Sequence, residues 1–304
     1  MDARSQIRAF ALLGLVMAFW AGNSIVGRAV ADDVPPFTLA LVRWTGALAL
    51  VLPFALRTLR HDGAALREAW RVVLALGLLG VAAFNALLYS GLHFTTASNA
   101  LLLQAAIPAL VMLLDRWVFK VRSGWLQIVA TALSTLGVLV VIFRGDWTAA
   151  LALDLNRGDA LVLCAVVAWA LYTILLRLRP QVRPISLIAV TFAIGVAAMA
   201  PLSAWEIARG ARVEFGWPVA LAFLYVALFP SVISYSIYNS AAQVVGPARA
   251  GQAITLMPLF GALLSAVLLG ERLHPYHALG MALICFGIVL GAVTLMRGRG
   301  PGAG

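Results

Sequence analysis

Long apolar stretches separated by short polar segments run through the whole chain. A transmembrane helix needs about 20 apolar residues to cross roughly 30 Å of hydrocarbon. Ten stretches reach this length, and the breaks between them carry charged residues, glycine or proline. The expected spans are residues 7–28, 36–56, 72–92, 97–116, 124–143, 159–177, 184–205, 217–238, 248–269 and 276–296. The pattern predicts an all-α integral membrane protein of ten transmembrane helices, with no domain outside the bilayer.

The composition excludes the main alternatives to a membrane protein. Of the 304 residues, 63% are hydrophobic and 11% are charged, whereas soluble proteins are about half apolar and about a quarter charged. So few charges cannot cover a soluble surface, which excludes a soluble enzyme, a disordered chain and a coiled coil. Cys164 and Cys285 both fall in apolar spans, so no disulfide framework is expected.

The net charge of +10 points to orientation in a bilayer rather than to nucleic acid, which is not expected as a partner. Lysine and arginine concentrate in the cytoplasmic loops of membrane proteins. If the N-terminus lies inside, most of the basic residues fall in inner segments, including the four arginines between Arg57 and Arg71. We therefore expect a multi-pass protein of a bacterial-type inner (plasma) membrane with both termini cytoplasmic.

The chain also contains an internal repeat. Distinctive residues recur at a spacing of 149 or 150 positions: Trp20 and Trp169, Arg28 and Arg177, Tyr89 and Tyr238, Pro108 and Pro258, Gly137 and Gly287. This predicts two five-helix units, residues 1–147 and 148–304. Because five is odd, the second unit enters the membrane inverted. Inverted repeats of this kind place a substrate site near the midplane and support alternating access.

The chain resembles the drug/metabolite transporter superfamily, with two halves of the EamA type. The features that carry the resemblance in the first half are Trp20-Ala21, Asn23, Arg43, Tyr89-Ser90-Gly91-Leu92, Ala97 and Pro108. Those in the second half are Pro258, Leu269-Gly270-Glu271-Arg272-Leu273, Gly280 and Gly287. The first half has Lys120-Val121-Arg122 where the second has the Gly-Glu-Arg run, a departure from the pattern.

Within this superfamily, the chain is most similar to amino-acid exporters of the YddG type. The resemblance implies a transporter that moves aromatic or neutral amino acids and related metabolites outward. The direction rests on the resemblance alone, because an inverted repeat is nearly symmetric about the membrane.

Arg43 lies within the second span, where a charge costs about 2.5–3.5 kcal/mol on insertion scales. Three interpretations are open. The guanidinium clamps a neighbouring helix, which we favour, or it contacts substrate, or it snorkels to the interface. The resemblance includes an arginine near this place, which strengthens the second interpretation.

No carboxylate is expected near the midplane. Asp115 beside Arg116, and Glu271 beside Arg272, read as interfacial ion pairs. Ion-driven carriers usually place Asp, Glu or His deep in the membrane. We therefore expect transport without ion coupling, with a proton-coupled drug or metabolite antiporter as the alternative.

Polar and aromatic residues inside the spans are the remaining candidates for a site. Aromatic faces with scattered amides suit a cavity for a partly polar solute, although amides in transmembrane helices also serve as interhelical contacts. The predicted substrate-binding residues are Trp20, Asn23, Arg43, Asn85, Tyr89, Gln104, Trp169, Tyr172, Tyr238 and Gln252.

Pro108 and Pro258 are expected to lie mid-span and to kink their helices, as gating hinges or as static bends. Gly280, Gly287 and Gly291 form a small-residue face on the last span. That face packs within the chain or makes a homodimer.

No motif for a metal, a nucleotide or another cofactor is found, and no nucleophile–base pair that would indicate an intramembrane enzyme. A channel is disfavoured, because an inverted repeat with paired prolines is typical of a carrier. The expected function is transport of small solutes across the lipid bilayer.

Overall fold

The computed structural model describes residues 3–104, 106–121, 123–143, 156–269 and 275–297. Within these residues every regular element is helical and no strand occurs. Six helical segments are long and apolar enough to cross a membrane: Ser5–Ala29, Pro36–Glu68, Trp70–Leu92, Arg157–Leu178, Pro184–Ala208 and Trp217–Val245. Two shorter apolar helices are Trp125–Val140 and Ala278–Gly291. The protein is therefore a multi-pass membrane protein.

The two halves of the chain have similar series of helices, with two additional 3₁₀ segments in the second half. The first half contains α1 (Ala3–Ala29), α2 (Pro36–Glu68), α3 (Trp70–Leu76), the π-helix η1 (Gly77–Ala83), α4 (Phe84–Leu92), α5 (Ala97–Gln104), α6 (Ile107–Phe119) and α7 (Trp125–Ile142). The second half contains α9 (Arg157–Leu175), the 3₁₀ turn η2 (Leu176–Leu178), α10 (Pro184–Ala208), α11 (Trp217–Ala227), the π-helix η3 (Leu228–Ile233), α12 (Ser234–Val245), α13 (Pro247–Gln252), the 3₁₀ segment η4 (Ala253–Leu256), α14 (Met257–Leu269) and α15 (Pro275–Arg297).

The two predicted proline-bearing spans are interrupted rather than continuous α-helices. Span 97–116 is divided into α5 and α6, and span 248–269 into α13, η4 and α14. Pro108 and Pro258 are the second residues of α6 and α14, where the missing N–H has no helical acceptor to lose. The expected mid-helix kinks are therefore starts of new helical segments.

One predicted boundary is wrong. The region from Arg57 to Arg71 was expected to be a loop, but α2 continues to Glu68. Arginine, leucine, alanine and glutamate are all good helix formers. The charges therefore end the apolar span without ending the helix.

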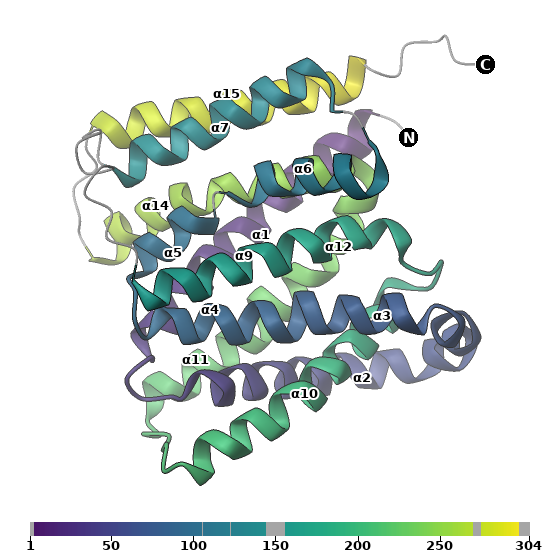
Figure 1. Ribbon diagram of the computed structural model, residues 1–304, viewed down its shortest axis with the longest axis vertical. Helices are drawn as coiled ribbons and strands as arrows, with labels where there is room; N and C mark the ends of the chain where they lie inside the picture. The colour runs from purple at the N-terminus through teal and green to yellow at the C-terminus, as the bar shows by residue number, and fades with distance from the viewer. Residues whose placement is uncertain (1–2, 105, 122, 144–155, 270–274, 298–304) are drawn as a thin grey trace.

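Helices from the two halves pack in matched pairs, and α1 and α11–α12 run obliquely across most of the other helices (Figure 1). α2 lies along α10 and α7 lies along α15, while α1 packs on α12 and α4 packs on α9. α1 begins and α15 ends at the same end of the molecule.

The α2–α10 pair is tied at both ends. Near the C-terminus of α10, the Glu206 carboxylate accepts hydrogen bonds from the backbone N–H groups of Phe37 (3.0 Å) and Thr38 (2.9 Å) at the start of α2. Near the C-terminus of α2, Asp62 accepts from Ser186 Oγ (2.6 Å) and Arg183 N (3.2 Å) at the start of α10. Each carboxylate therefore caps the partner helix, where unpaired N–H groups and the helix dipole favour negative charge.

The small-residue face of the last helix is used inside the chain. A Cβ added at Gly137 of α7 would lie 2.6 Å from the Gly280 carbonyl oxygen, and one at Gly287 would lie 2.6 Å from the Ala130 carbonyl oxygen. Only glycine permits so close an approach of α7 and α15. The homodimer stays a prediction, and any contact through α15 has to use its outward side, which carries the exposed Phe286 and Val289.

Candidate functional site

The centre of the molecule is organised around Arg43 of α2, whose side chain is only 2% exposed. Its Nη1 donates to Asn23 Oδ1 (2.9 Å), Asn85 Oδ1 (2.8 Å) and Tyr89 OH (2.8 Å). Its Nε donates to Ser231 Oγ (2.7 Å), and its Nη2 donates to the Pro230 carbonyl oxygen (3.2 Å). The guanidinium therefore clamps α1, α2 and α4 of the first half to η3 of the second.

None of these acceptors is charged. The guanidinium also lies 4.6 Å from the Trp44 ring centroid, and no carboxylate among the described residues pairs with it. Among the residues that the structure describes, the ion pair found is Arg177–Asp115, which does not involve Arg43. Taking a charge out of water is costly unless an opposite charge compensates it. The site is therefore a hydrogen-bonded cation whose charge is not neutralised by any carboxylate of the described residues.

Two π-helical turns supply carbonyl groups to this centre. In η3, the Pro230 oxygen accepts from Trp20 Nε1 (2.9 Å) as well as from Arg43. In η1, the Gly80 oxygen accepts from Tyr235 OH. A π-turn interrupts the regular i→i−4 ladder, which frees carbonyls for side chains, and such turns are frequent at functional sites.

Pro230 and Ser231 are not among the candidates predicted from the sequence, whereas Tyr235 was one of the aromatic candidates inside the spans. The available signal was Pro230, a proline in the middle of a predicted span. Nothing local indicated that its carbonyl oxygen would meet Arg43, 187 residues away.

An aromatic cluster lies next to Arg43. The Trp20 and Trp169 rings meet edge to face with centroids 4.9 Å apart, in the T-shaped geometry that aromatic pairs prefer. Tyr235 lies 5.7 Å from Trp169 and 6.1 Å from Trp20. The predicted repeat partners Trp20 and Trp169 are therefore in direct contact at the centre.

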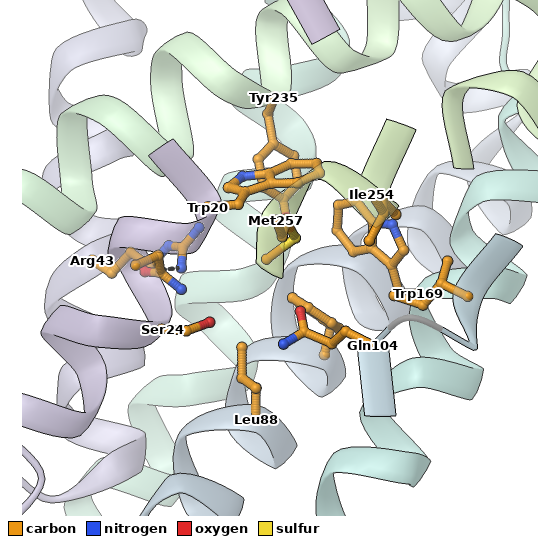
Figure 2. Close-up of a pocket in the computed structure, with 12 residues that line it drawn as sticks. Trp20, Ser24, Arg43, Leu88, Gln104, Trp169, Tyr235, Ile254 and Met257 are labelled. Atoms are coloured by element: carbon orange, nitrogen blue, oxygen red, sulfur yellow. Dashed lines mark hydrogen bonds between the residues drawn. The ribbon is translucent and has the colours of Figure 1, made fainter. Parts of the chain in front are cut away.

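Between Arg43 and the aromatic cluster lies a small cavity (Figure 2). The residues that line it are Trp20, Asn23, Ser24, Arg43, Phe84, Leu88, Gln104, Ile107, Trp169, Tyr235, Ile254 and Met257. Ser24 Oγ is buried and meets no hydrogen-bond partner among the described residues. The cavity volume is about 20 Å³, which holds about one water molecule. The site is closed, and a solute can enter only if the surrounding helices separate.

The structure brings most of the predicted site residues together. Trp20, Asn23, Arg43, Gln104 and Trp169 line the cavity. Asn85 and Tyr89 do not line the cavity, but both accept hydrogen bonds from Arg43.

Two predicted tyrosines lie just outside the cavity. Tyr172 OH donates to Asn239 Oδ1. Tyr238 OH lies 3.2 Å from Thr173 Oγ1, and the Tyr238 ring packs on Trp20 with centroids 5.1 Å apart. Tyr172 and Tyr238 do not line the cavity; they pack behind Trp169 and Trp20, which do.

Gln252 lies elsewhere, between α7, α13 and α15. Its Nε2 donates to the Gly287 carbonyl oxygen (3.0 Å) and its Oε1 accepts from Gln127 Nε2 (2.9 Å). It does not line the cavity. Gln252 therefore makes an interhelical contact, the alternative role expected for amides inside transmembrane helices.

The two prolines adjoin the cavity. Ile107 and Met257, which line it, each directly precede a proline, Pro108 and Pro258. The breaks in α5–α6 and η4–α14 therefore occur at the cavity wall in both halves.

The expected partner of Asp115 is wrong. Asp115 of α6 is buried and pairs with Arg177 Nε of η2 at 2.8 Å, while the adjacent Arg116 is exposed. Neighbours in a helical sequence point in different directions, so adjacency alone does not pair them. The other expected pair, Glu271 with Arg272, lies outside the described residues.

Comparison with known proteins gives consistent matches along the chain. Residues 8–143 and residues 156–292 each match the EamA-like transporter family. The chain is 28% identical to the "uncharacterized inner membrane transporter YedA" of Escherichia coli over 97% of this chain and 93% of that protein. It is 26% identical to the "uncharacterized transporter YyaM" of Bacillus subtilis, over 84% of this chain and 83% of that protein.

A third relative, "uncharacterized protein PA1977" of Pseudomonas aeruginosa, is 30% identical over 88% of each chain. A solved crystal structure superposes with a TM-score of 0.72 at 19% identity, covering 96% of this chain and 99% of the other. That likeness concerns the fold alone.

Proposed function

The chain belongs to the EamA-like transporter family, and we propose that it exports amino acids with aromatic or neutral side chains, and related metabolites, across a bacterial-type inner membrane. The observation that carries this proposal is the Arg43 cation, buried at the cavity with neutral partners only. Both termini are cytoplasmic in this proposal, and the ten expected spans form two inverted halves.

The cavity chemistry suits an amino acid. A carboxylate would neutralise Arg43 and could also accept a hydrogen bond from Ser24, whose hydroxyl is buried without a partner. An ammonium group would be attracted to the faces of Trp20 and Trp169 and to the side-chain oxygen of Gln104. An apolar or aromatic side chain would pack against Tyr235 and Met257.

The pairing of helices supports alternating access. In chain order, the counterparts in the two halves are α1 and α9, α2 and α10, α4 and α12, and α7 and α15. When each helix is replaced by its counterpart, the α1–α12 contact becomes the α9–α4 contact, and the α2–α10 and α7–α15 contacts stay the same. This is the pattern that a pseudo-two-fold axis produces. The cavity is lined by both halves, so rocking of one half against the other would open it to either side.

The distribution of titratable groups favours uncoupled transport over the proton-coupled alternative. No Asp, Glu or His is among the residues that line the cavity. His93, just beyond α4, also lies outside the lining, and burial lowers its pKa, which leaves it neutral at pH 7.

Counterflow in proteoliposomes tests this proposal. Vesicles preloaded with phenylalanine or leucine should accumulate the labelled amino acid without a pH gradient. Phenylalanine should compete and its carboxamide should not, because only the free acid neutralises Arg43. Equal competition by the carboxamide would contradict the role of Arg43, and accumulation only under a pH gradient would favour the proton-coupled antiporter.

A further inference from the structure

The face of the protein formed by α6 and α7 carries a second, larger hollow that is separate from the central cavity. It is a groove of about 600 Å³. Its walls are built from one face of each helix and are mostly apolar, chiefly Met112, Leu113, Ile128, Ala132, Leu136 and Leu139, with Thr131 and Thr135 among them. Between Ile128 and Leu139 the α7 wall is about 16 Å long at 1.5 Å per residue. The groove is therefore an extended apolar slot, a shape that suits a hydrocarbon chain.

One end of this groove is polar and positively charged. Arg116 and Ser123 line it there, and Lys120 follows within one turn and is exposed. Trp117 and Trp125 next to them are 80% and 74% exposed. Exposed tryptophans beside basic residues are typical of the level of lipid headgroups.

The positive charge at this end is not neutralised by the described part of the protein. Asp115 is the nearest acid in the sequence, and it is engaged by Arg177 on the opposite side of α6. Arg116 has no acidic partner among the described residues. A net-negative headgroup therefore complements this end better than a zwitterionic one does.

We propose that the α6–α7 groove binds an anionic phospholipid, with one acyl chain along the apolar walls and the phosphate at Arg116. Basic pockets between transmembrane helices are known to hold anionic headgroups. The groove shares no lining residue with the central cavity, so lipid binding there does not depend on which solute the protein transports.

Thermal unfolding of the full-length protein in detergent tests the headgroup preference. Added phosphatidylglycerol should raise the Tm of the wild type more than phosphatidylcholine with the same acyl chains. Arg116→Gln should abolish that difference. Arg60→Gln, which removes an exposed charge from the extension of α2, should keep it. Equal shifts by the two lipids, or no effect of Arg116→Gln, would overturn the proposal, as would an equal shift by glycerol phosphate without acyl chains.

Photocrosslinking locates the lipid and stays informative if Arg116→Gln is unstable. Phosphatidylglycerol with a photoreactive acyl chain should label α6 and α7, and Leu136→Trp, which fills the groove, should reduce the labelling. Leu279→Trp on the exposed face of α15 should not. Labelling spread evenly over the other lipid-facing helices, or a dimer whose second copy covers the groove, would refute the site.

Discussion

The two halves of the central site share breaks in the helical backbone but carry different side chains. In the first half, Asn23, Arg43 and Asn85 form a polar, cationic cluster. The positions 149 residues later are Tyr172, Phe192 and Ser234. Phe192 packs on Trp44 with centroids 4.9 Å apart, so the counterpart of the buried cation is an apolar ring.

The backbone features, in contrast, are kept in both halves. Each half has a π-turn whose carbonyl oxygen accepts from an aromatic side chain of the other half: Pro230 from Trp20, and Gly80 from Tyr235. Each half also has a proline directly after a residue that lines the cavity. The comparison teaches that the repeat supplies the shape of the site, while side-chain divergence gives it one polar end and one aromatic end.

Removing the cation should have the largest effect. Arg43→Gln should reduce counterflow by roughly 100-fold or more, because loss of a buried charged partner costs about 2–5 kcal/mol. Phe192→Leu, at the equivalent position, should change it only a few-fold. Similar losses in both variants at equal amounts of folded protein would show that the two halves contribute alike.

The pseudo-equivalent tyrosines offer a matched pair for stability. Tyr89→Phe should destabilise by about 1.5–3 kcal/mol, because it removes an acceptor from the Arg43 cation. Tyr238→Phe should cost about 0.5–1.5 kcal/mol, because its hydroxyl contacts the neutral Thr173 and not a charged group among the described residues. The measurement is unfolding in detergent, and a larger loss at Tyr238 would contradict this assignment.

The prolines test whether the shared backbone breaks are hinges. Pro108→Ala and Pro258→Ala should each lower transport several-fold with little change in membrane insertion. Each proline lies at the start of a helix, where the N–H that it lacks would have no helical acceptor, so no helical hydrogen bond depends on the residue being proline or alanine. Transport and the amount of folded protein falling in parallel would instead indicate static breaks.

The smallest effect is expected at the two caps of the α2–α10 pair. Glu206→Ala should destabilise by about 1 kcal/mol, the usual effect of losing a helix cap, because the carboxylate is buried and holds Phe37 and Thr38. Asp62→Ala should cost less, since water can replace an acceptor that is only partly buried. Unfolding temperatures compare the two variants, and equal losses would show that burial does not distinguish the two ends.

Much of the fold could be predicted because membrane insertion depends on local apolar length. The predicted spans around Trp20, Arg43 and Trp169 all lie in helices. The errors arose where a local signal has two meanings. Charges after Arg57 end a span but not a helix, and a proline such as Pro108 can bend a helix or begin one.

The candidate site was predicted less completely. Arg43, Trp20 and Gln104 were identified because polar and aromatic residues in apolar spans stand out. Gln252 belongs to the same class and yet joins α7, α13 and α15 instead. The Pro230 carbonyl oxygen was not predicted, because backbone acceptors leave no trace in residue type.

The sequence by itself determined the membrane class, the two EamA-type halves and the presence of an arginine within the second apolar span. The tertiary structure alone decided that Arg43 joins the two halves, that Asp115 meets Arg177, and that the cavity is closed to about 20 Å³. The physical reason is that bilayer insertion rewards apolar surface on every side of a helix. Periodicity therefore cannot say which face meets which neighbour, and only close packing of distant segments selects the contacts.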